Sequence, residues 1–550
     1  MPYPESMRAS MRLVEATRAV RMREAFPRMD PDQKTALLQE FHPDFRAAGM
    51  RPVRVGPNAG DRVPNEFADQ LEARSRIDPE TFELSGIDFD VDVLVIGGGG
   101  GGSTAALVAQ ENGARVLLAT KLRHGDSNTT MAEGGIAASS HLHDNPALHF
   151  LDTMGGGRYM NKRDLVQALV LDAPVVLDWL MKLGVMFDRE PDGTLTCSLA
   201  GGQSRKRIHS AKDYSGLEMM RVLRDQCRNR DIPVLEFSPA VELLTDETGQ
   251  CAGAVLRNYD TGRYVVVRAR TVILATGGIG RLHILGFPTT NHYGATADGL
   301  VIAYRAGARL LYMDAIQYHP TGAAWPEQML GWLCTEALRG TGAHLVNAEG
   351  QRFINELETR DATSSAILRE VNHRKKGVRT PAGIEGVWLD TPIIDTIGYK
   401  GKIHRLFAGL ERRFNNYGID MIKEPLFVYP TQHYQNGGVD MVNPTGTSSV
   451  PNLFLAGEVA GGVQGRNRLG GNSLVDIFVF GRRAGLAAAE QAKKTTLGRL
   501  GLRHVTAYHK ALKEAGIDNG QVSPLLLPDY VVPPATNKSA GAAEQGMSVR

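Results

Sequence analysis

Residues 91–103 have the sequence Val-Asp-Val-Leu-Val-Ile-Gly-Gly-Gly-Gly-Gly-Gly-Ser, an apolar run followed by six glycines. The run predicts a buried strand at 91–96, and the residues after the glycines predict a helix at 103–110. The glycines that fit the spacing Gly-x-Gly-x-x-Gly are Gly97, Gly99 and Gly102. The first makes a turn, the second lets backbone approach a pyrophosphate, and the third lets helix and strand pack closely. The stretch predicts a dinucleotide-binding unit and therefore an α/β fold.

The second strand of this unit indicates which dinucleotide binds. It ends Leu117-Leu118-Ala119-Thr120-Lys121, without the Asp or Glu that would bind a ribose hydroxyl of NAD. Its ending therefore argues against NAD as the ligand.

Five fragments further along the chain carry the polar groups of a second candidate site. They supply two imidazoles, three guanidiniums, a hydroxyl and a carboxyl group. An Arg side chain suits a carboxylate because its planar fork donates two parallel hydrogen bonds. Two His and a Thr can hold a second carboxylate, so we expect a site for a small dianion. The fragments are Asp314–Gly322, Thr335–Gly340, Thr359–Asp361, Gln432–Tyr434 and Asn467–Leu474.

In this order the fragments resemble the flavoprotein subunit of succinate dehydrogenase and fumarate reductase, whose close relatives include L-aspartate oxidase. The resemblance runs from about residue 90 to about residue 492. It implies a Rossmann-like, three-layer FAD-binding domain with an inserted α+β capping domain. It also implies FAD as cofactor, a C4-dicarboxylate as substrate and, as partner, an iron–sulfur electron-transfer subunit.

The resemblance assigns the substrate-binding residues. One carboxylate of the substrate would be bound by His319, Thr335 and Glu336, and the other by His433 and Arg468. Clamping both ends would hold the double bond flat against the flavin, and such orientation removes several kcal/mol from a barrier, on the order of 7 or more in ideal geometry.

The proton donor implied by the resemblance is Arg360. Arginine is almost always charged and is an unusual general acid, so a relay must return its proton. Glu336 and Arg339, three residues apart on one helical face, match that relay. The residues assigned to catalysis are Arg360, Glu336, Arg339, His319, His433 and Arg468.

A larger set is assigned to FAD, partly from the glycine motif and partly from the resemblance. It comprises Gly97, Gly99, Gly102, Thr120, Lys121, Ser127, Asn128, Thr129, Gly134, Gly135, Ala275, Thr276, Gly277, Asp298, Glu458, Asn472, Ser473 and Leu474.

The chain departs from the respiratory members at Asn128. Counting from Lys121 without gaps, Asn128 falls where those members have a histidine bonded covalently to FAD, and His124 is four residues early. An asparagine cannot make that bond, so the flavin is expected to be non-covalent. Within the family this loss favours fumarate reduction over succinate oxidation.

The expected domains follow from the positions of the motifs. Residues 1–89 form an N-terminal helical extension, with an N-cap and capping box at Asp30-Pro31-Asp32-Gln33 opening a helix to about Phe41. Residues 90–313 and 434–492 form the FAD-binding domain, and 314–433 form the capping domain. Residues 493–550 hold a short helix at 503–514 and a proline-rich extended tail, replacing the longer helical domain of respiratory members, and the last fifteen residues are expected to be disordered.

The composition argues against several classes of function and site. The formal net charge is +2, from 62 basic and 60 acidic residues, which gives no support for nucleic-acid binding. The four cysteines lack a Cys-x-x-Cys pair, so neither a metal site nor a disulfide framework is expected. No run of 18 apolar residues is present. The expected location is the cytoplasm, or its membrane face through partner subunits.

The partner is expected because one flavin without clustered cysteines has no internal path to a distant electron donor. The N-terminal helices and the proline-rich tail are unusual, and both are expected to be exposed docking surfaces.

The leading hypothesis is interconversion of fumarate and succinate. L-Aspartate oxidase is the alternative, favoured by Thr335–Gly340, by Asn128 and by the segment around His209. The residues 470–476 resemble the dehydrogenase pattern instead. A relative acting on a bulkier succinyl or enoyl compound, and an electron-transfer subunit with an idle pocket, stay open as well.

Overall fold

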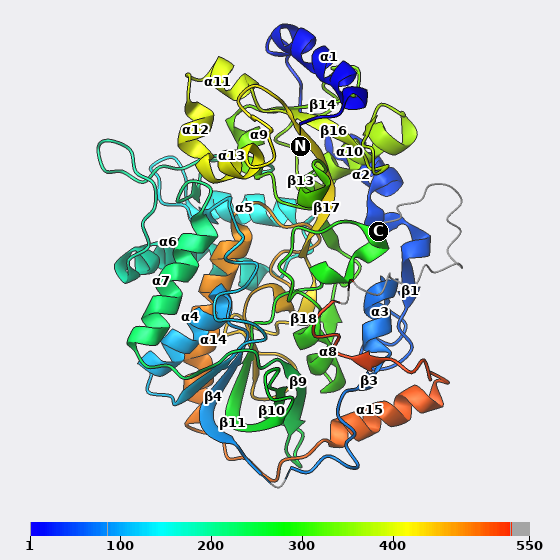
Figure 1. The fold of residues 1–550 in the computed structure, drawn as a ribbon. Coiled ribbons are helices and arrows are strands. Elements are labelled where there is room, and N and C mark those ends of the chain that lie inside the picture. The colour runs from blue at the N-terminus through cyan, green and yellow to red at the C-terminus, as the bar shows by residue number, and fades with distance from the viewer. Residues whose placement is uncertain (1, 85, 529, 531–550) are drawn as a thin grey trace.

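The computed structural model describes residues 2–84, 86–528 and 530. In Figure 1 a domain built on a largely parallel sheet occupies the lower part of the molecule, and a second, smaller sheet lies above it. The buried apolar side chains form two large clusters, one in each part. The clusters do not follow the proposed boundaries closely, since Ile316 and Tyr318 belong to the lower one, and the boundaries at 314 and 433 stay a prediction.

The lower sheet has seven strands. Its order is β8 (Val234–Leu235), β5 (Val116–Ala119), β4 (Phe89–Ile96), β11 (Tyr264–Leu274), β10 (Cys251–Arg257) and β9 (Ala240–Thr245), with β19 (Leu453–Leu455) also on β11. The first four and β19 are mutually parallel, whereas β10 and β9 are antiparallel. The carboxyl ends of the parallel strands therefore meet at one edge, where such sheets bind ligands.

Helices cover this sheet. The helix α4 (Gly100–Glu111) packs on α7 (Ser215–Asn229) and α14 (Asn472–Ala492), and α14 packs on α6 (Arg163–Leu183), which contacts α5 (Pro146–Gly156). Close approach of α4 and α14 depends on glycine, because a Cβ on Gly485 would lie 2.6 Å from the Ala105 oxygen. The helix α8 (Asp298–Arg305) contacts β9 and the small sheet of β12 (Leu310–Leu311), β18 (Gly438–Asp440) and β20 (Ala460–Gly461) through β18. The predicted α/β class is confirmed.

The upper sheet is antiparallel. Its order is β13 (Ile316–Ala323), β17 (Leu426–Gln435), β16 (Glu385–Asp390) and β14 (His344–Val346), with β15 (Val378–Arg379) on β16. The helices around it are α9 (Glu336–Thr341), α10 (Arg360–Leu368), α11 (Ile393–Ile397), α12 (Lys402–Leu406) and α13 (Ala408–Asn415). We call this part the cap. The helix α10 packs on β13, which brings two of the predicted site fragments together.

The N-terminal extension contains strands as well as helices. Its elements are α1 (Glu5–Arg21), α2 (Pro31–Phe41), β1 (Met50–Pro52), β2 (Arg62–Pro64), α3 (Asn65–Leu71) and β3 (Arg74–Ser75). The predicted start of α2 is confirmed: the Asp30 side chain accepts a hydrogen bond from the Gln33 amide, and the reciprocal bond of the capping box is present.

The helix α1 is not a free docking segment. Met7 and Val14 are buried in the hydrophobic cluster of the cap. Arg18 and Arg21 bind the buried carboxylate of Asp390 at 2.8 and 2.7 Å. The expectation that the N-terminal helices are wholly exposed is therefore wrong, because their apolar face and two of their guanidiniums are satisfied by the cap.

The C-terminal region returns to the N-terminal extension. The helix α15 (Arg503–Glu514) has the predicted bounds, and β21 (Val522–Ser523) pairs with β3 in parallel. The tail up to Pro528 is therefore packed rather than exposed, which corrects the second docking expectation. The prediction of disorder in the last fifteen residues lies outside the described residues.

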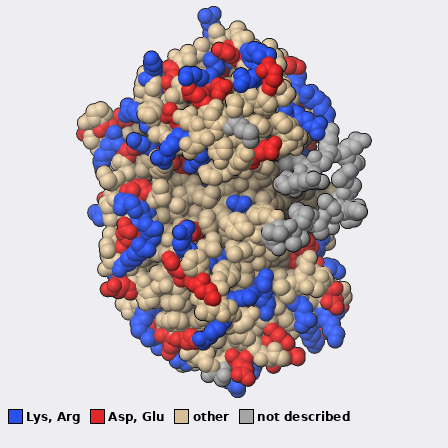
Figure 2. All heavy atoms as spheres, viewed as in Figure 1, with Lys and Arg blue, Asp and Glu red and all other residues tan. Residues whose placement is uncertain are grey.

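The surface carries no large region of one charge on the face shown in Figure 2, where basic and acidic side chains alternate. Among the described residues, no helix combines the length and apolar content needed to cross a bilayer.

Candidate active site

A long cavity opens at the carboxyl edge of the parallel strands. One part of its wall is the glycine turn after β4 together with Thr120 and Lys121 at the end of β5. Another part is formed by His433 and Arg468, which belong to the predicted substrate fragments. The two sites predicted separately from the sequence therefore meet at His433 and Arg468, whereas His319, Thr335, Glu336, Arg339 and Arg360 lie behind the cavity wall.

The glycine turn fits a dinucleotide. A Cβ on Gly98 would lie 2.8 Å from the Thr120 hydroxyl oxygen, and a Cβ on Gly102 would lie 1.8 Å from the Gly97 carbonyl oxygen. Glycines at both positions therefore let strand and helix approach closely. The helix α4 begins at Gly100, so its first N–H groups and its dipole face the cavity as a pyrophosphate requires.

Most residues assigned to FAD line this cavity. They are Gly97, Gly99, Thr120, Lys121, Ser127, Asn128, Thr129, Ala275, Thr276, Gly277, Asp298, Glu458, Ser473 and Leu474.

Four assigned residues are not in the cavity wall. Gly102 packs α4 against β4, and Gly134 lies beside Gly135, where a Cβ would meet the His209 carbonyl oxygen at 2.4 Å. The Asn472 side chain is fully buried and bonds His149 and Thr153 on α5, so it does not face the cofactor. For Gly102, Gly135 and Asn472 the structure shows a packing role instead of a lining one, whereas exposed Gly134 has open space around it.

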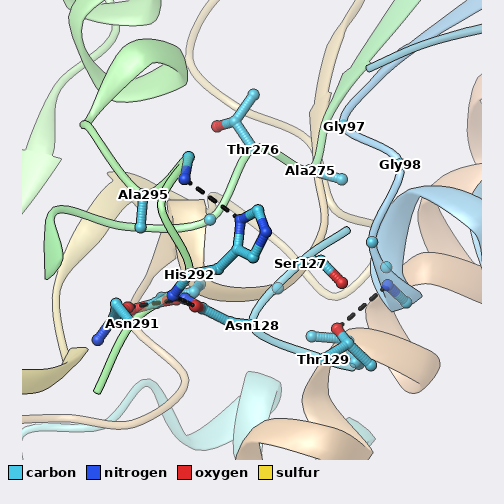
Figure 3. Close-up of a pocket in the computed structure, with 18 of the residues that line it drawn as sticks. Gly97, Gly98, Ser127, Asn128, Thr129, Ala275, Thr276, Asn291, His292 and Ala295 are labelled. Atoms are coloured by element: carbon cyan, nitrogen blue, oxygen red, sulfur yellow. Dashed lines mark hydrogen bonds between the residues drawn. The ribbon is translucent and has the colours of Figure 1, made fainter. Parts of the chain in front are cut away.

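Asn128 is held by a loop that is distant in sequence. Figure 3 shows it beside Asn291 and His292, with Ser127 and Thr129 on the same segment. Its amide nitrogen donates to Asn291 at 2.7 Å, and its amide oxygen accepts from the His292 backbone N–H at 2.5 Å. His124 is buried against Ser103 at 2.9 Å and does not line the cavity.

Lys121 and Asp298 form an ion pair of 2.5 Å in the cavity wall. Burial lowers the pKa of Lys121 while the Asp298 carboxylate opposes that shift. Burial also raises the pKa of Asp298, against the lowering effect of Lys121. Each charge of the pair therefore stabilises the other in its buried position, and the Lys121 ammonium is bonded to the cavity wall.

The predicted substrate residues converge where the cap meets the cavity. The rings of His319 and His433 lie 5.0 Å apart, centroid to centroid. The amide oxygen of Gln317 accepts from Arg360 Nη1 at 3.1 Å and from Arg468 Nη2 at 3.0 Å. Fragments far apart in sequence thus place two imidazoles and two guanidiniums around one point.

Glu336 joins two arginines of this cluster. Its Oε2 accepts from Arg360 Nε at 2.6 Å and lies 3.8 Å from Arg339 Nη2, and its Oε1 accepts from the Gly201 amide at 2.6 Å. Burial alone would raise the pKa of Glu336, but Arg360, Arg339 and these hydrogen bonds lower it to about 2. The carboxylate is therefore ionised between two guanidiniums.

Burial and neighbouring positive charge shift the other basic groups of the cluster. Burial, reinforced by Arg360, lowers the pKa of His319 and of His433 well below the usual value. Burial and then Arg360 lower the pKa of Arg468 to about 9, and its guanidinium stacks on the Tyr434 ring at 4.4 Å. Within the described part of the chain, Arg468 Nε has no hydrogen-bond partner.

Thr335 and Arg339 have structural contacts as well. The Thr335 hydroxyl caps α9 by accepting from the Ala337 amide at 3.4 Å. Arg339 Nη1 donates to the Glu356 carbonyl, while its Nε and Nη2 have no hydrogen-bond partner among the described residues. A buried guanidinium with free N–H groups is able to exchange a proton with a neighbour. The catalytic assignments of both residues stay a prediction.

The sequence assigns no role to Gln317 or Thr290. In the sequence, Gln317 is only one residue of the fragment Asp314–Gly322. Its position between Arg360 and Arg468 depends on the antiparallel pairing of β13 with β17. The Thr290 hydroxyl lies 2.6 Å from His433 Nδ1 and orients that ring. His209, singled out in the sequence, bonds Ser140 at 2.9 Å in the pair β6 (Ile136–Ala137) and β7 (Ile208–His209).

Comparison with known proteins agrees with this geometry. A family model described as FAD binding domain matches residues 92–474. The chain is 38% identical to a protein of Methanothermobacter marburgensis named as part of fumarate reductase (CoM/CoB), over 74% of each chain. It is equally 38% identical to an L-aspartate oxidase of a Nostoc species, over 76% of this chain and 71% of that one.

Comparison with a solved structure also indicates similarity to a fumarate reductase. A quinol-fumarate reductase with menaquinol molecules superposes with a TM-score of 0.69 at 32% identity, covering 78% of this chain and 75% of that one. Because the family model spans more than half of the chain and the glycine turn fits a pyrophosphate, the cofactor is FAD. The chain belongs to the FAD-dependent family that contains the flavoprotein subunits of fumarate reductase and succinate dehydrogenase.

Proposed function

We propose that this protein interconverts fumarate and succinate, as the flavoprotein subunit of a larger reductase complex. The observation that carries the proposal is the cluster of His319, His433, Arg360 and Arg468, of which His433 and Arg468 line the FAD cavity. The free Nε of Arg468 gives this cluster a donor for an incoming anion. A C4-dicarboxylate supplies two negative charges that such a clamp can bind at both ends.

The roles of the residues follow from their positions. His433 and Arg468 line the cofactor cavity and bind one carboxylate, while His319 and Thr335 hold the other. Glu336, which the resemblance also assigns to the substrate, is an ionised carboxylate that would repel a second one, so its role here is to hold Arg360. Fixed positive groups beside the bound carboxylate stabilise the negative charge that develops on the adjacent carbon. Bound FAD supplies or accepts the hydride at its N5 position.

In fumarate reduction, the hydride goes to one carbon of the double bond and Arg360 gives the proton to the other. Its Nε bond of 2.6 Å to Glu336 connects it to Arg339, so a proton lost from Arg360 is replaced along that path. The low pKa of Glu336, about 2, keeps its carboxylate charged between the two guanidiniums.

A second candidate is L-aspartate oxidase, which the 38% identity to the Nostoc enzyme favours. Both enzymes need two carboxylate clamps, but an oxidase must also accept an α-amino group. A bulkier succinyl or enoyl substrate would use the same clamp at one end.

The deciding experiment compares two substrates on one anaerobic preparation. Fumarate reduction is followed with reduced methyl viologen, and L-aspartate oxidation is followed by bleaching of the flavin absorbance. We expect kcat/KM for fumarate to exceed that for L-aspartate by at least about a hundredfold, because the clamp has no group reserved for an ammonium. Comparable values would replace the proposal with aspartate oxidase, and rapid turnover of neither would point to the bulkier substrate.

The electron-transfer partner is proposed to be an iron–sulfur subunit. Relatives of this chain are named as subunits of fumarate reductases. Among the described residues no group of three or more His, Cys, Asp or Glu could hold a metal ion. We therefore place the path for electrons on another chain, and we propose a cytoplasmic complex.

A further inference from the structure

The C-terminal residues Gln521–Pro528 and Tyr530 lie along the outside of the FAD cavity wall. Its first part is anchored by β21, which pairs with β3. The Arg305 guanidinium donates to the Ser523 hydroxyl at 2.8 Å and to the Ser523 carbonyl at 3.1 Å, and all of these groups are buried. Arg76 donates to the carbonyls of Pro524 and Leu525 at 2.5 and 3.2 Å. The path of the segment is thus fixed before it reaches the cavity.

Leu526 has a strained backbone at the point where the segment meets the wall. Its φ is +70°, in the left-handed region that L-residues rarely adopt. Its side chain is buried in a cluster with Ile77, Val241 and Val505. The surrounding contacts must impose a conformation of this kind, because it is unfavourable on its own.

The strained residue directs its carbonyl oxygen at two wall residues. That oxygen accepts from Lys121 Nζ at 2.5 Å and from the Thr296 hydroxyl at 2.9 Å. The same ammonium donates to the Gly294 carbonyl at 2.8 Å and to the Thr296 hydroxyl at 2.7 Å, and it pairs with Asp298. Lys121, Gly294 and Asp298 all line the FAD cavity. One lysine therefore ties the C-terminal segment to the cavity wall.

This part of the wall belongs to the adenosine end of the cofactor. Lys121 follows β5 closely, and the carboxyl end of that strand meets the ribose in a dinucleotide-binding unit. Beyond it, the segment crosses the loop that carries His292 and Gly294. The Pro528 carbonyl accepts from the Tyr293 hydroxyl at 3.0 Å, and the Tyr530 hydroxyl lies 2.8 Å from His283 Nε2.

We propose that the residues Gln521–Pro528 and Tyr530 support the FAD site and retain the cofactor by holding the adenosine end of the cavity closed. Lys121 and Leu526 are the positioning residues of this closure. The segment comes from a region that the family model does not match, since that match ends at residue 474.

The test measures how fast FAD leaves the protein. Holoprotein is diluted into buffer with charcoal as a trap for released cofactor, and the loss of bound FAD is followed by absorbance. Three proteins are compared with the full chain: one ending at Asn519, Arg76→Met and the control Arg74→Met. The Arg74 side chain is exposed and has no hydrogen bond among the described residues, although Arg74 is a near neighbour of Arg76.

We expect release of FAD to accelerate at least about tenfold in Arg76→Met, and further in the shortened chain, with no change in Arg74→Met. The affinity of the apoprotein for ADP, which has the adenosine end without the flavin, should fall by a similar factor. Thermal unfolding of the apoproteins separates retention from general stability, because Arg76→Met should unfold within a few degrees of the full chain.

Unchanged FAD release in Arg76→Met would overturn the proposal, whether or not the shortened chain folds. It would also be overturned if release accelerates while ADP affinity stays the same, or if the acceleration is matched by an equal loss of apoprotein stability. The assay needs no turnover, so its failure is independent of the substrate proposed above.

Discussion

At the scale of single residues, Arg360 and Arg468 are both charged neighbours of Gln317, but they should behave differently on substitution. Arg360→Gln should lose at least about a thousandfold in turnover while substrate affinity stays near normal, because general acid catalysis contributes about 10²–10⁴. Turnover is measured anaerobically, and affinity from the shift in flavin absorbance on adding fumarate.

Arg468→Ala is the matched comparison. It removes a carboxylate clamp worth about 1.5–3 kcal/mol, so the dissociation constant for fumarate should rise by roughly tenfold or more. If Arg360→Gln turns over at near the normal rate, Arg360 has only a structural role through Glu336.

The contacts of Asn128 predict that the flavin is not covalently attached. Its amide is bonded to Asn291 and the His292 backbone, and it offers no nucleophilic ring to the cofactor. Acid precipitation should therefore leave the yellow colour in the supernatant. A yellow pellet, or a flavin-bearing peptide in mass spectrometry, would show a covalent link at another residue.

Asp476 predicts a pH dependence of stability. Burial raises its pKa to about 7, against the lowering effect of Gln464, which donates to it at 2.8 Å. Because the folded pKa lies above the ordinary 3.8, the folded state holds the proton longer, and stability falls as pH rises from about 4 to about 7. Asp476→Asn should be more stable than the original chain at pH 8, by at least about 1 kcal/mol, and similar at pH 4.

The measurement is thermal unfolding of both proteins across that pH range. A stability difference that stays constant from pH 4 to pH 8 would mean that Asp476 does not titrate there.

At the scale of elements, α1 offers a test of how the N-terminal extension is held. Arg21→Met removes one of the two guanidiniums on buried Asp390 and should lower the free energy of unfolding by about 1.5–3 kcal/mol. Arg12→Met is the control, since Arg12 is exposed and pairs with exposed Glu5. Thermal unfolding and hydrogen exchange in residues 5–21 report the difference; equal effects of both variants would contradict the burial argument.

The elements also show what sequence can predict. The bounds of α15 and the capping box of α2 depend on local signals, namely apolar spacing and the residues at the helix ends, and both were predicted correctly. The start of α4 was predicted three residues late, because glycines do not favour a helix, and the close approach of Gly485 and the packing at the cavity edge stabilise one there.

The residues of the candidate site also separate into those that the sequence predicts and those that it does not. The motifs pointed to His319, Arg360 and Arg468, whose meeting the structure shows. The bridging role of Gln317, the inward turn of Asn472 toward α5 and the contact of Leu526 with Lys121 depend on long-range packing. No local pattern encodes those contacts, so sequence alone could not predict them.

At the scale of the whole molecule, the extension spans both parts of the structure. The helix α1 packs on the cap, Lys34 binds Glu358 at 2.7 Å close to Arg360 in the chain, and Val53 and Phe67 belong to the lower core. The extension therefore helps to hold the cap over the cavity. Leu13 and Val20 on the other face of α1 are exposed, so docking of a partner there stays a prediction.

A prediction for the assembly follows. Gentle purification from the native source should yield the chain together with iron and acid-labile sulfide in a second protein, because the proposed function needs an external electron path. Iron analysis and size-exclusion chromatography test it, with the isolated recombinant chain as control. A lone, fully active monomer free of iron would contradict the partner proposal.

The pairing of β3 with β21 also has a consequence for biosynthesis. At about 5–20 residues per second, the ribosome makes Val522 roughly 20–90 s after Arg74, so one side of this pair waits unpartnered while most of the chain emerges. The carbonyl of Leu526 that binds Lys121 is made later still. Under the closure proposed above, the adenosine end of the cofactor site stays open throughout synthesis, so we expect stable loading of FAD only after the chain is complete.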